Sequence, residues 1–226
     1  MYNTQRVCVI GAGPQGLAAL KNLLDLNDSG SKIFDAEILE SRSSLGGLWC
    51  YSDDPRTPTT LKSTISNTSK WRNCYSDFPV NEAWEMAEKS GSIPTYSTQE
   101  ETLMYLEQYS KKFGLEKHIR FDHRVCGIAR SADQKQWEVI VTLKKGRQPQ
   151  IKLYDKVIVA TGQNAIPHVP IIENIEQYTG DVMHTASFKR CFILYLNLVH
   201  ISNCSVRAHS MGKRFWWWDL AVLLRI

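Results

Sequence analysis

The N-terminal part of the chain combines short apolar runs with a longer helical pattern. Residues 6–10 form a short apolar run, which predicts a buried strand. Residues 17–26 carry leucines at helical spacing and predict an α-helix. Residues 36–40 are a second short and mostly apolar run, which predicts another strand. The order of strand, turn, helix and strand is typical of a β-α-β unit whose two strands are parallel.

Two further helices are expected in the middle of the chain. Residues 41–60 are rich in glycine, proline and serine, and this composition predicts a long loop. Residues 81–89 and 98–113 show helical patterns. Ser97 and Thr98 are the two candidate N-caps of the second helix, because either hydroxyl could accept a hydrogen bond from its first turn.

The next group of elements is an antiparallel meander. Residues 118–125, 137–143 and 151–153 alternate apolar with polar positions, as strands with one buried face do. Residues 156–162 are instead a continuous apolar run that ends in glycine, which predicts another strand of the parallel sheet. The fold class predicted from these patterns is α/β, with a parallel sheet and a β-meander insertion.

Composition narrows the class of protein. The 226 residues are 43% apolar and 22% charged, which suits one large globular domain or two small ones. The net charge of +4 comes from scattered basic residues, so no nucleic-acid partner is expected. None of the 6 cysteines is spaced as C-x-x-C, so neither a redox dithiol nor a metal site is predicted. Without a signal-peptide layout or an apolar run of about 18 residues, we expect a cytoplasmic protein with no membrane span.

A glycine pattern follows the first predicted strand directly. Gly11, Gly13 and Gly16 form G-x-G-x-x-G between a strand and a helix, the arrangement of a dinucleotide-binding turn. Gly11 allows the tight turn, Gly13 lets a pyrophosphate approach the backbone, and Gly16 lets the helix pack closely on the strand. Pro14 and Gln15 belong to the same predicted phosphate site at the helix N-terminus. The alternative is a glycine turn that is merely tight.

An acid and a second glycine pair complete the predicted site. Glu40 ends the second strand, where a carboxylate can accept hydrogen bonds from both ribose hydroxyls. The alternative for Glu40 is an ordinary surface acid. Gly46 and Gly47 follow the acid, and such a loop resembles those of FAD enzymes, where it wraps the ribose and pyrophosphate. Leu48 and Trp49 continue this loop, and Trp49 either packs beside FAD or is a plain core aromatic.

At this point the sequence resembles the flavin-containing monooxygenases, which depend on FAD and NADPH. The resemblance covers residues 5–190 and rests on "GAGPQGLAAL", "ESRSSLGGLW", "NTSKWRNCYSDFP", "VIVATG" and "YTGDVMHTASF". The last stretch matches the family fingerprint F-x-G-x-x-x-H-x-x-x-[FY]. Its matching positions are Tyr178, Gly180, His184 and Phe188. Tyr178 departs mildly from the family phenylalanine, and Phe188 favours the amine- and sulfide-oxidising branch over the Baeyer–Villiger branch, where tryptophan is usual.

The resemblance implies a chemistry and its cofactors. In the family, NADPH reduces FAD, the reduced flavin captures O2 as a C4a-hydroperoxide, and one oxygen passes to an amine nitrogen or a sulfide. The implied partners are therefore O2 and a small nucleophilic substrate, while the oligomeric state stays open. The resemblance implies a Rossmann-like FAD-binding domain as the fold.

The resemblance also implies roles for single residues. Asn67 matches the family asparagine near the flavin and the nicotinamide and is the catalytic candidate, with a turn asparagine as the alternative. His184 would lie in a linker next to the cofactor, the alternative being a structural or surface histidine. Asp77 and Phe78 match a family loop of structural role. Further cofactor contacts are implied for Thr68, Val125, Ala160, Thr161 and Gly162.

The C-terminal part departs from the family pattern. Residues 1–190 are predicted to be the FAD-binding part, incomplete at its C-terminus, and residues 191–226 to be an aberrant tail that replaces the NADPH domain. The codons from Phe215 through the tryptophans Trp216 to Trp218 to Asp219, shifted by two bases, encode Leu-Val-Val-Gly, which would begin the family's NADPH strand. We therefore predict a retained intron or a mis-called exon, followed by a shifted frame. The alternative is a genuine, divergent C-terminus with an apolar tryptophan patch.

Three readings of the function remain open. The first is a monooxygenase, present here as an N-terminal fragment whose own FAD binding is weak or absent and which oxidises no NADPH. The second is a catalytically inactive FAD-binding remnant. The third is another flavin oxidoreductase, which could be a Baeyer–Villiger monooxygenase, a flavin disulfide reductase or an amine oxidase. The missing C-x-x-C argues against a disulfide reductase, and the fingerprint argues against an amine oxidase.

Overall fold

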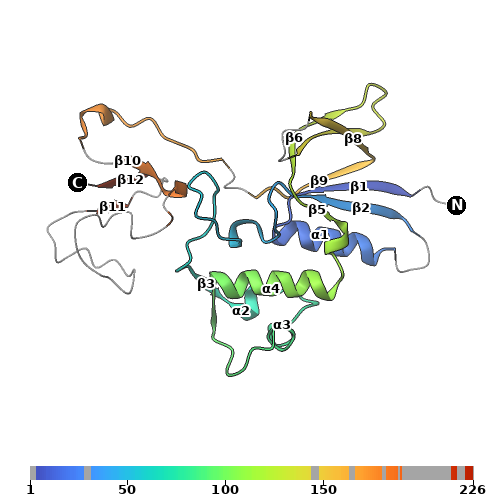
Figure 1. Ribbon diagram of the computed structural model, residues 1–226, viewed down its shortest axis with the longest axis horizontal. Coiled ribbons are helices and arrows are strands. Elements are labelled where there is room, and N and C mark those ends of the chain that lie inside the picture. The colour runs from blue at the N-terminus through green and yellow to red at the C-terminus, as the bar shows by residue number, and fades with distance from the viewer. Residues whose placement is uncertain are drawn as a thin grey trace.

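A parallel sheet lies at the centre of the larger part of the molecule (Figure 1). The computed structural model describes residues 4–27, 32–143, 148–162, 166–179, 182–187, 189, 215–217 and 222–225. Four strands pair in the order β5-β2-β1-β9, and every pair is parallel. Their bounds are Gln5–Ile10 for β1, Phe34–Leu39 for β2, Ile119–Arg120 for β5 and Lys156–Val159 for β9. The predicted parallel unit is confirmed, and β9 is the further parallel strand that the sequence predicts; it pairs with β1 and ends before the predicted residue 162.

The central strand β1 is buried on both faces, which explains why its sequence is an unbroken apolar run. Val7 and Val9 point to one hydrophobic core, which they share with Leu17 of α1 (Pro14–Asp25). Cys8 and Ile10 point to a second core on the opposite face. Because successive side chains of a strand alternate between faces, one apolar run serves two cores.

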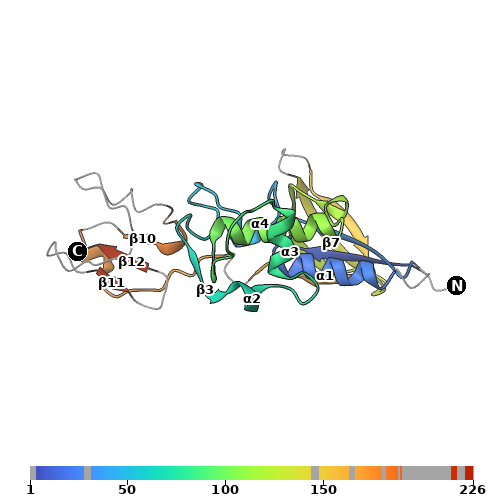
Figure 2. The same cartoon turned by 90° about the horizontal axis from the view of Figure 1, so that it is seen from below.

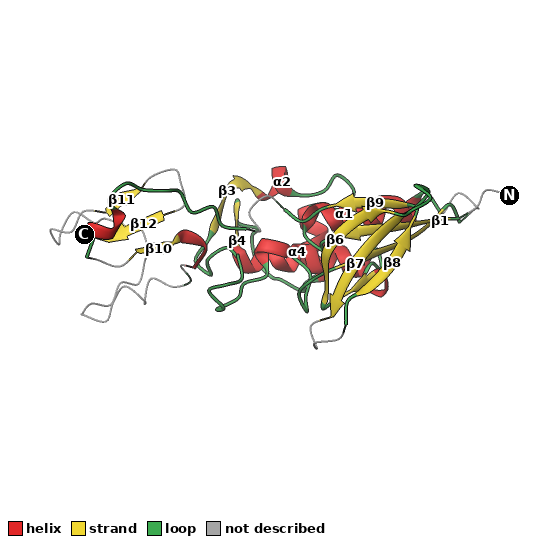
Figure 3. Ribbon diagram, turned by 90° about the horizontal axis from the view of Figure 1, so that it is seen from above, coloured by secondary structure: helices red, strands yellow, loops and turns green. Residues whose placement is uncertain are grey.

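The antiparallel meander covers the face opposite α1. It consists of β6 (His123–Arg130), β7 (Trp137–Leu143) and β8 (Gln150–Tyr154), paired in that order. Figure 3 shows these strands side by side at one end of the molecule. The expected single strand over 118–125 is wrong in one respect, because its first part is β5 of the parallel sheet. Asp122, with a φ of 58°, turns the chain between the two strands.

Helix α4 (Gln99–Lys112) runs beside α1 and completes the first core (Figure 1). Its N-cap is Thr98, whose side chain accepts from the Glu101 N–H while the Glu101 side chain accepts from the Thr98 N–H. The second of the two N-cap candidates is therefore confirmed. Helix α3 covers Val80–Met86 and is shorter than the predicted 81–89. The remaining elements near α4 are α2 (Lys70–Asn73), the hairpin strands β3 (Ile65–Ser69) and β4 (Tyr96–Thr98), and the single-turn helices η1 (Gly47–Trp49) and η2 (Glu116–His118).

The last described elements lie at the opposite end of the molecule from the parallel sheet (Figures 1 and 2). Strands β10 (Val182–His184), β12 (Val222–Arg225) and β11 (Phe215–Trp217) pair antiparallel in that order. The short helices η3 (Ile175–Gln177) and η4 (Thr185–Ser187) belong to the same part of the chain. Most of the predicted tail, residues 191–214, 218–221 and 226, lies outside the described residues. Within the described part of the chain, no helix has the length and apolar character needed to cross a membrane.

Candidate dinucleotide-binding site

The glycine turn between β1 and α1 has no space for side chains at two positions. Gly11 has a φ of +104°, and a Cβ on it would lie 2.6 Å from the Ala160 carbonyl oxygen. A Cβ on Gly16 would lie 1.9 Å from the Gly11 carbonyl oxygen. The Gly11 N–H also donates to the Leu39 carbonyl at 2.9 Å, which ties the turn to β2. Glycine at these two positions is therefore required by the tight strand–turn–helix connection.

The first turn of α1 presents backbone donors that nothing in the described chain uses. Among the described residues, the N–H groups of Gly13, Gln15 and Gly16 have no acceptor, and no side chain caps the helix at Gly13. A Cβ on Gly13 would meet only the Gly47 Cα, at 3.8 Å, so it would project into open space. Free N–H groups at a helix N-terminus favour an anion, and the space beside Gly13 admits one. The residues present therefore fit a pyrophosphate.

Glu40 lies at the carboxyl end of its strand, against the glycine turn. The residue is 5% exposed, and Oε2 accepts from the Ala12 N–H at 2.7 Å. Oε1 accepts from the Arg42 N–H at 2.8 Å and from the Ser41 hydroxyl at 3.2 Å. A carboxylate has about four acceptor positions, so these three donors leave room for a further one. The carboxylate thus lies where the sequence analysis expects it, and its binding of a ribose remains a prediction.

The second glycine pair packs directly on the first turn. The Gly46 N–H donates to the Ala12 carbonyl at 2.9 Å. Gly47 has a φ of +57°, and a Cβ on it would lie 3.2 Å from the Gly13 Cα. Leu48 is exposed, and Trp49 is partly buried against the first core. The structure therefore brings the two glycine motifs of the sequence into contact.

Two polar side chains hold this second loop, and the sequence analysis did not identify either. Arg42 donates through Nη1 to the Gly47 carbonyl at 2.6 Å and through Nη2 to the Cys50 carbonyl. Gln99, which is buried at the start of α4, donates through Nε2 to the Trp49 carbonyl. A basic residue just after the acid was a weak signal for Arg42, whereas nothing in the local sequence marks Gln99.

Gln99 also connects the second glycine loop to the strand of the catalytic candidate. Its N–H donates to the carbonyl of Thr64, the residue before β3, at 2.9 Å. Asn67 on β3 is exposed, and its Oδ1 accepts from the Thr68 hydroxyl at 3.3 Å. Gln99 therefore holds both the strand that carries Asn67 and the loop that carries Trp49. The Asn67 side chain is accessible to a ligand.

A buried ion pair anchors the end of this strand on α4. The Lys70 side chain is 2% exposed, and Nζ lies 3.0 Å from Glu101 Oε2, at an angle outside that of a hydrogen bond. Lys70 Nζ also lies 4.0 Å from the centroid of the Trp84 ring, a cation–π distance. Burial raises the pKa of Glu101, but the Thr98 N–H and the Lys70 ammonium outweigh it and hold that pKa below its usual range.

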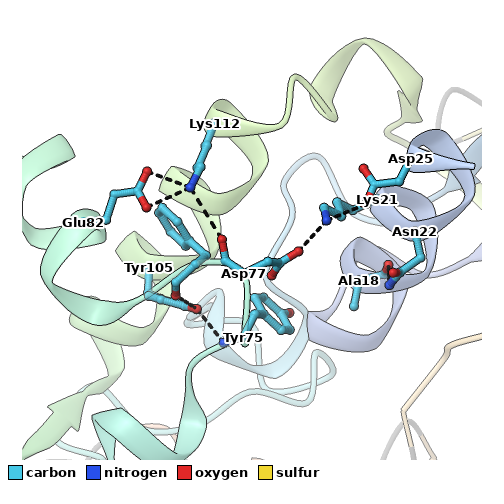
Figure 4. Close-up of polar contacts among 10 residues, drawn as sticks. Ala18, Lys21, Asn22, Asp25, Tyr75, Asp77, Glu82, Tyr105 and Lys112 are labelled. Atoms are coloured by element: carbon cyan, nitrogen blue, oxygen red, sulfur yellow. Dashed lines mark hydrogen bonds and ion pairs between the residues drawn. The ribbon is translucent and has the colours of Figure 1, made fainter. Parts of the chain in front are cut away.

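The loop with Asp77 and Phe78 bridges α1, α3 and α4 (Figure 4). Asp77 forms an ion pair with Lys21 of α1 at 2.5 Å, and Phe78 is fully buried. Lys112 of α4 forms an ion pair with Glu82 of α3 at 2.7 Å. Hydrogen bonds to Asp25 and Asp77 raise the pKa of Lys21. These contacts agree with the structural role that the resemblance implies for the loop.

The remaining predicted cofactor contacts lie at the end of β9 and on β6. The Ala160 N–H donates to the Ile10 carbonyl at 2.9 Å, so the end of β9 runs beside the turn. Thr161 and Gly162 follow it and are exposed, and Gly162 has a φ of +75°. Val125 lies on β6, is partly buried against the second core, and adjoins a change of register between β6 and β7.

Of the four fingerprint residues, the structure describes Tyr178 and His184. Gly180 and Phe188 are outside the described residues. The Tyr178 hydroxyl is buried and has no hydrogen-bond partner among the described residues. His184 Nδ1 accepts from the Ala186 N–H at 3.0 Å, so Nε2 carries the proton that is donated to the His168 carbonyl at 3.2 Å. No hydrogen bond or ion pair within the described chain joins Tyr178 or His184 to the glycine turn.

Comparison with known proteins shows the family to which the chain belongs. Residues 4–201 match the family described as flavin-binding monooxygenase-like (FMO-like). The chain is 35% identical over 183 residues to monooxygenase aurF of Gibberella zeae, covering 81% of this chain and 32% of that protein. It is 32% identical over 192 residues to flavin-containing monooxygenase 5 of Rattus norvegicus, covering 82% of this chain and 33% of that protein.

Solved structures show the same similarity. The crystal structure of Tmm from Pelagibacter sp. superposes with a TM-score of 0.72 at 26% identity, covering 81% of this chain and 42% of that chain. S-allyl-L-cysteine S-oxygenase from Allium sativum superposes with a TM-score of 0.69 at 25% identity, covering 83% and 43%. The chain belongs to the flavin-binding monooxygenase-like family, and it spans about a third of the length of the curated relatives that it matches.

Proposed function

We propose that the chain is the FAD-binding part of an NADPH-dependent monooxygenase that oxygenates a soft nucleophile. The observation that carries the proposal is the unused donor set of Gly13, Gln15 and Gly16, in the turn that the second glycine loop contacts at Gly47. A helix N-terminus with three free N–H groups and no side chain at its cap suits a pyrophosphate. Family membership supports a flavin as the molecule that carries it.

Each residue of the site has a proposed role toward the cofactor. Backbone N–H groups of the glycine turn bind the pyrophosphate, and Glu40 accepts from the ribose. Trp49 packs beside the cofactor, and the Asn67 amide donates and accepts next to the flavin and the nicotinamide. FAD, when bound, supplies the redox and oxygen-activating chemistry, and NADPH is the reductant. The protein's task is to orient these groups and to exclude water from them.

The proposed substrate is an amine or a sulfide. The relatives support this class: one is named a dimethylaniline monooxygenase (N-oxide-forming) of Mus musculus, 31% identical, and another is an S-oxygenase acting on S-allyl-L-cysteine. Phe188 supports the same branch through the fingerprint. The alternatives are a catalytically inactive FAD-binding remnant and, as the second candidate reaction, Baeyer–Villiger oxidation. Cyclohexanone monooxygenases at 23% identity share the fold and do not decide between the reactions. A cytoplasmic location stays a prediction of the sequence.

The test compares two proteins made from the same gene. One is the 226-residue chain, and the other is the product of a transcript in which residue 190 continues into the shifted frame. We expect the second protein to hold FAD and to convert a thioether or a tertiary amine with consumption of NADPH. We expect weak FAD binding and no NADPH oxidation from the first. A longer protein that retains FAD but oxidises neither substrate class would refute the proposed reaction, and a ketone converted to an ester would favour the second candidate.

The proposal also predicts the sequence of the transcript. Sequencing the messenger across the codons for residues 187–226 should reveal a spliced form in which Leu-Val-Val-Gly follows in frame. Transcripts that all encode the tail as written would favour the alternative, a catalytically inactive FAD-binding remnant.

A further inference from the structure

A tyrosine far along the chain holds the first residue of the phosphate-binding helix. The Tyr75 hydroxyl donates to the Pro14 carbonyl at 2.6 Å, across 61 positions of sequence. Pro14 is the first residue of α1, directly after Gly13. The contact therefore reaches the same turn that carries the free N–H groups.

Tyr75 is itself held by a second tyrosine, from α4. The Tyr105 hydroxyl accepts from the Tyr75 N–H at 2.7 Å and donates to the Phe78 carbonyl at 2.7 Å (Figure 4). The Phe78 N–H in turn donates to the Tyr75 carbonyl at 3.2 Å, which closes the loop on itself. Both hydrogen-bonding functions of the Tyr105 hydroxyl are thus used to fix the backbone from which the Tyr75 ring projects.

The same loop holds α1 at a second point. Asp77 forms an ion pair with Lys21, which lies about two full turns of the helix after Pro14. Two attachments along one helix fix its direction as well as its position. The loop therefore sets how the N-terminus of α1 is aimed, whereas one contact alone would leave the helix free to tilt.

Because of the geometry of the peptide bond, the hydrogen bond from Tyr75 to the Pro14 carbonyl also determines the direction of a backbone N–H. The Pro14 carbonyl and the Gln15 N–H belong to one planar trans peptide unit, so they point in opposite directions. A bond that fixes the carbonyl oxygen of Pro14 also fixes the direction of the free Gln15 N–H. A hydrogen bond to the carbonyl further polarises the unit and strengthens the N–H as a donor.

We propose that Tyr75 is a positioning residue for the cofactor's pyrophosphate: its hydroxyl holds the Pro14 carbonyl and so aims the Gln15 N–H at the phosphate. This inference rests on the proposed function of the site. Packing alone does not require the hydroxyl, because the Tyr75 ring is already held by the rings of Tyr105 and Tyr109, with centroids 5.8 and 4.2 Å away. The hydroxyl is therefore the part of Tyr75 that serves the turn.

The test uses the full 226-residue chain with Tyr75→Phe and a matched control. Tyr109→Phe removes a hydroxyl from the same aromatic cluster, and among the described residues that hydroxyl makes no hydrogen bond to α1. ADP, which carries a pyrophosphate, and adenosine, which does not, are titrated by NMR shift changes. We expect Tyr75→Phe to lower the affinity for ADP by about 3- to 10-fold, the effect of one hydrogen bond, and to leave the affinity for adenosine unchanged. Tyr109→Phe should change neither affinity.

Each other result has a fixed meaning. Unchanged ADP affinity in Tyr75→Phe, or an equal loss for ADP and adenosine, overturns the proposal, because the hydroxyl then has no role or a purely structural one. If the unsubstituted chain binds neither ligand, the cofactor site is not formed by the 226-residue chain alone, and amide hydrogen exchange decides the inference separately. Faster exchange at residues 16–18 in Tyr75→Phe, but not in Tyr109→Phe, supports the positioning role. Equal exchange in the two variants overturns it.

Discussion

Substituting Gly13 by alanine should separate cofactor binding from folding. The φ of Gly13 is −77° and its ψ is −176°, an extended conformation that alanine adopts without strain. The new Cβ would meet no protein atom closer than 3.8 Å. The methyl group would instead occupy the space through which a phosphate oxygen reaches the N–H groups of the turn.

The expected magnitudes follow from these contacts. Losing glycine at a helix N-cap costs about 0.5–1 kcal/mol, and the reduced entropy of the unfolded chain returns about 0.4–1 kcal/mol. The free energy of unfolding should therefore change by less than about 0.5 kcal/mol. Displacing the phosphate from one N–H removes a charged hydrogen bond of about 1.5–3 kcal/mol, which lowers the affinity for FAD by about 10- to 150-fold.

Two measurements on the same preparation test this. Urea denaturation gives the stability, and quenching of flavin fluorescence gives the FAD affinity. Gly16→Ala is the contrasting variant, because its Cβ would lie 1.9 Å from a backbone oxygen and should prevent normal folding. Gly13→Ala that binds FAD like the unsubstituted chain would show that the pyrophosphate does not lie against Gly13. Gly13→Ala that unfolds would show that the turn is not as open as described.

Two further predictions concern buried ionisable groups. The pKa of Glu101 is lowered in the folded state, so its stabilisation is complete above the unfolded value of about 4.3 and is lost as pH falls through the lower folded value. Glu101→Gln keeps the capping bond but removes the carboxylate that pairs with Lys70. It should lower the free energy of unfolding by about 3 kcal/mol at neutral pH and leave it unchanged in acid, where the Glu101 carboxyl is protonated. An equal loss of stability in acid would contradict the ion pair as the cause. Burial, together with the Glu37 charge, raises the pKa of the Cys8 thiol to about 12, so alkylation at pH 8 should be slow until the chain unfolds, whereas the exposed Cys126 should react at once. Mass spectrometry of the two peptides measures this directly, and rapid labelling of Cys8 in the folded chain would refute its burial.

Local patterns were enough to predict the elements and the glycine turn. The run around Val7 is apolar because both faces of its strand are covered, and Gly16 is glycine because a backbone oxygen lies against it. Such constraints act within a few residues and so remain visible in the sequence. The split between β5 and β6 was missed because one residue, Asp122, reverses the local backbone without changing the apolar alternation.

The supports of the site could not be predicted in the same way. Gln99 reaches Trp49 across 50 positions, and Tyr75 reaches Pro14 across 61. Both contacts join a polar side chain to a backbone carbonyl, and such contacts have no period or spacing in the sequence. They depend on where α4 and the 75–78 loop come to lie, which only the folded structure shows.

The position of α4 couples three separate loops into one cooperative unit. Gln99 holds the loop at Trp49, Glu101 holds the strand end at Lys70, and Tyr105 holds the turn at Tyr75. All three partners lie 30–50 residues earlier in the chain, so these loops cannot order until the helix has docked, and undocking the helix releases them together. We expect the dinucleotide site to assemble late and in a single step, and a bound cofactor to protect α4 from local unfolding although it need not touch that helix.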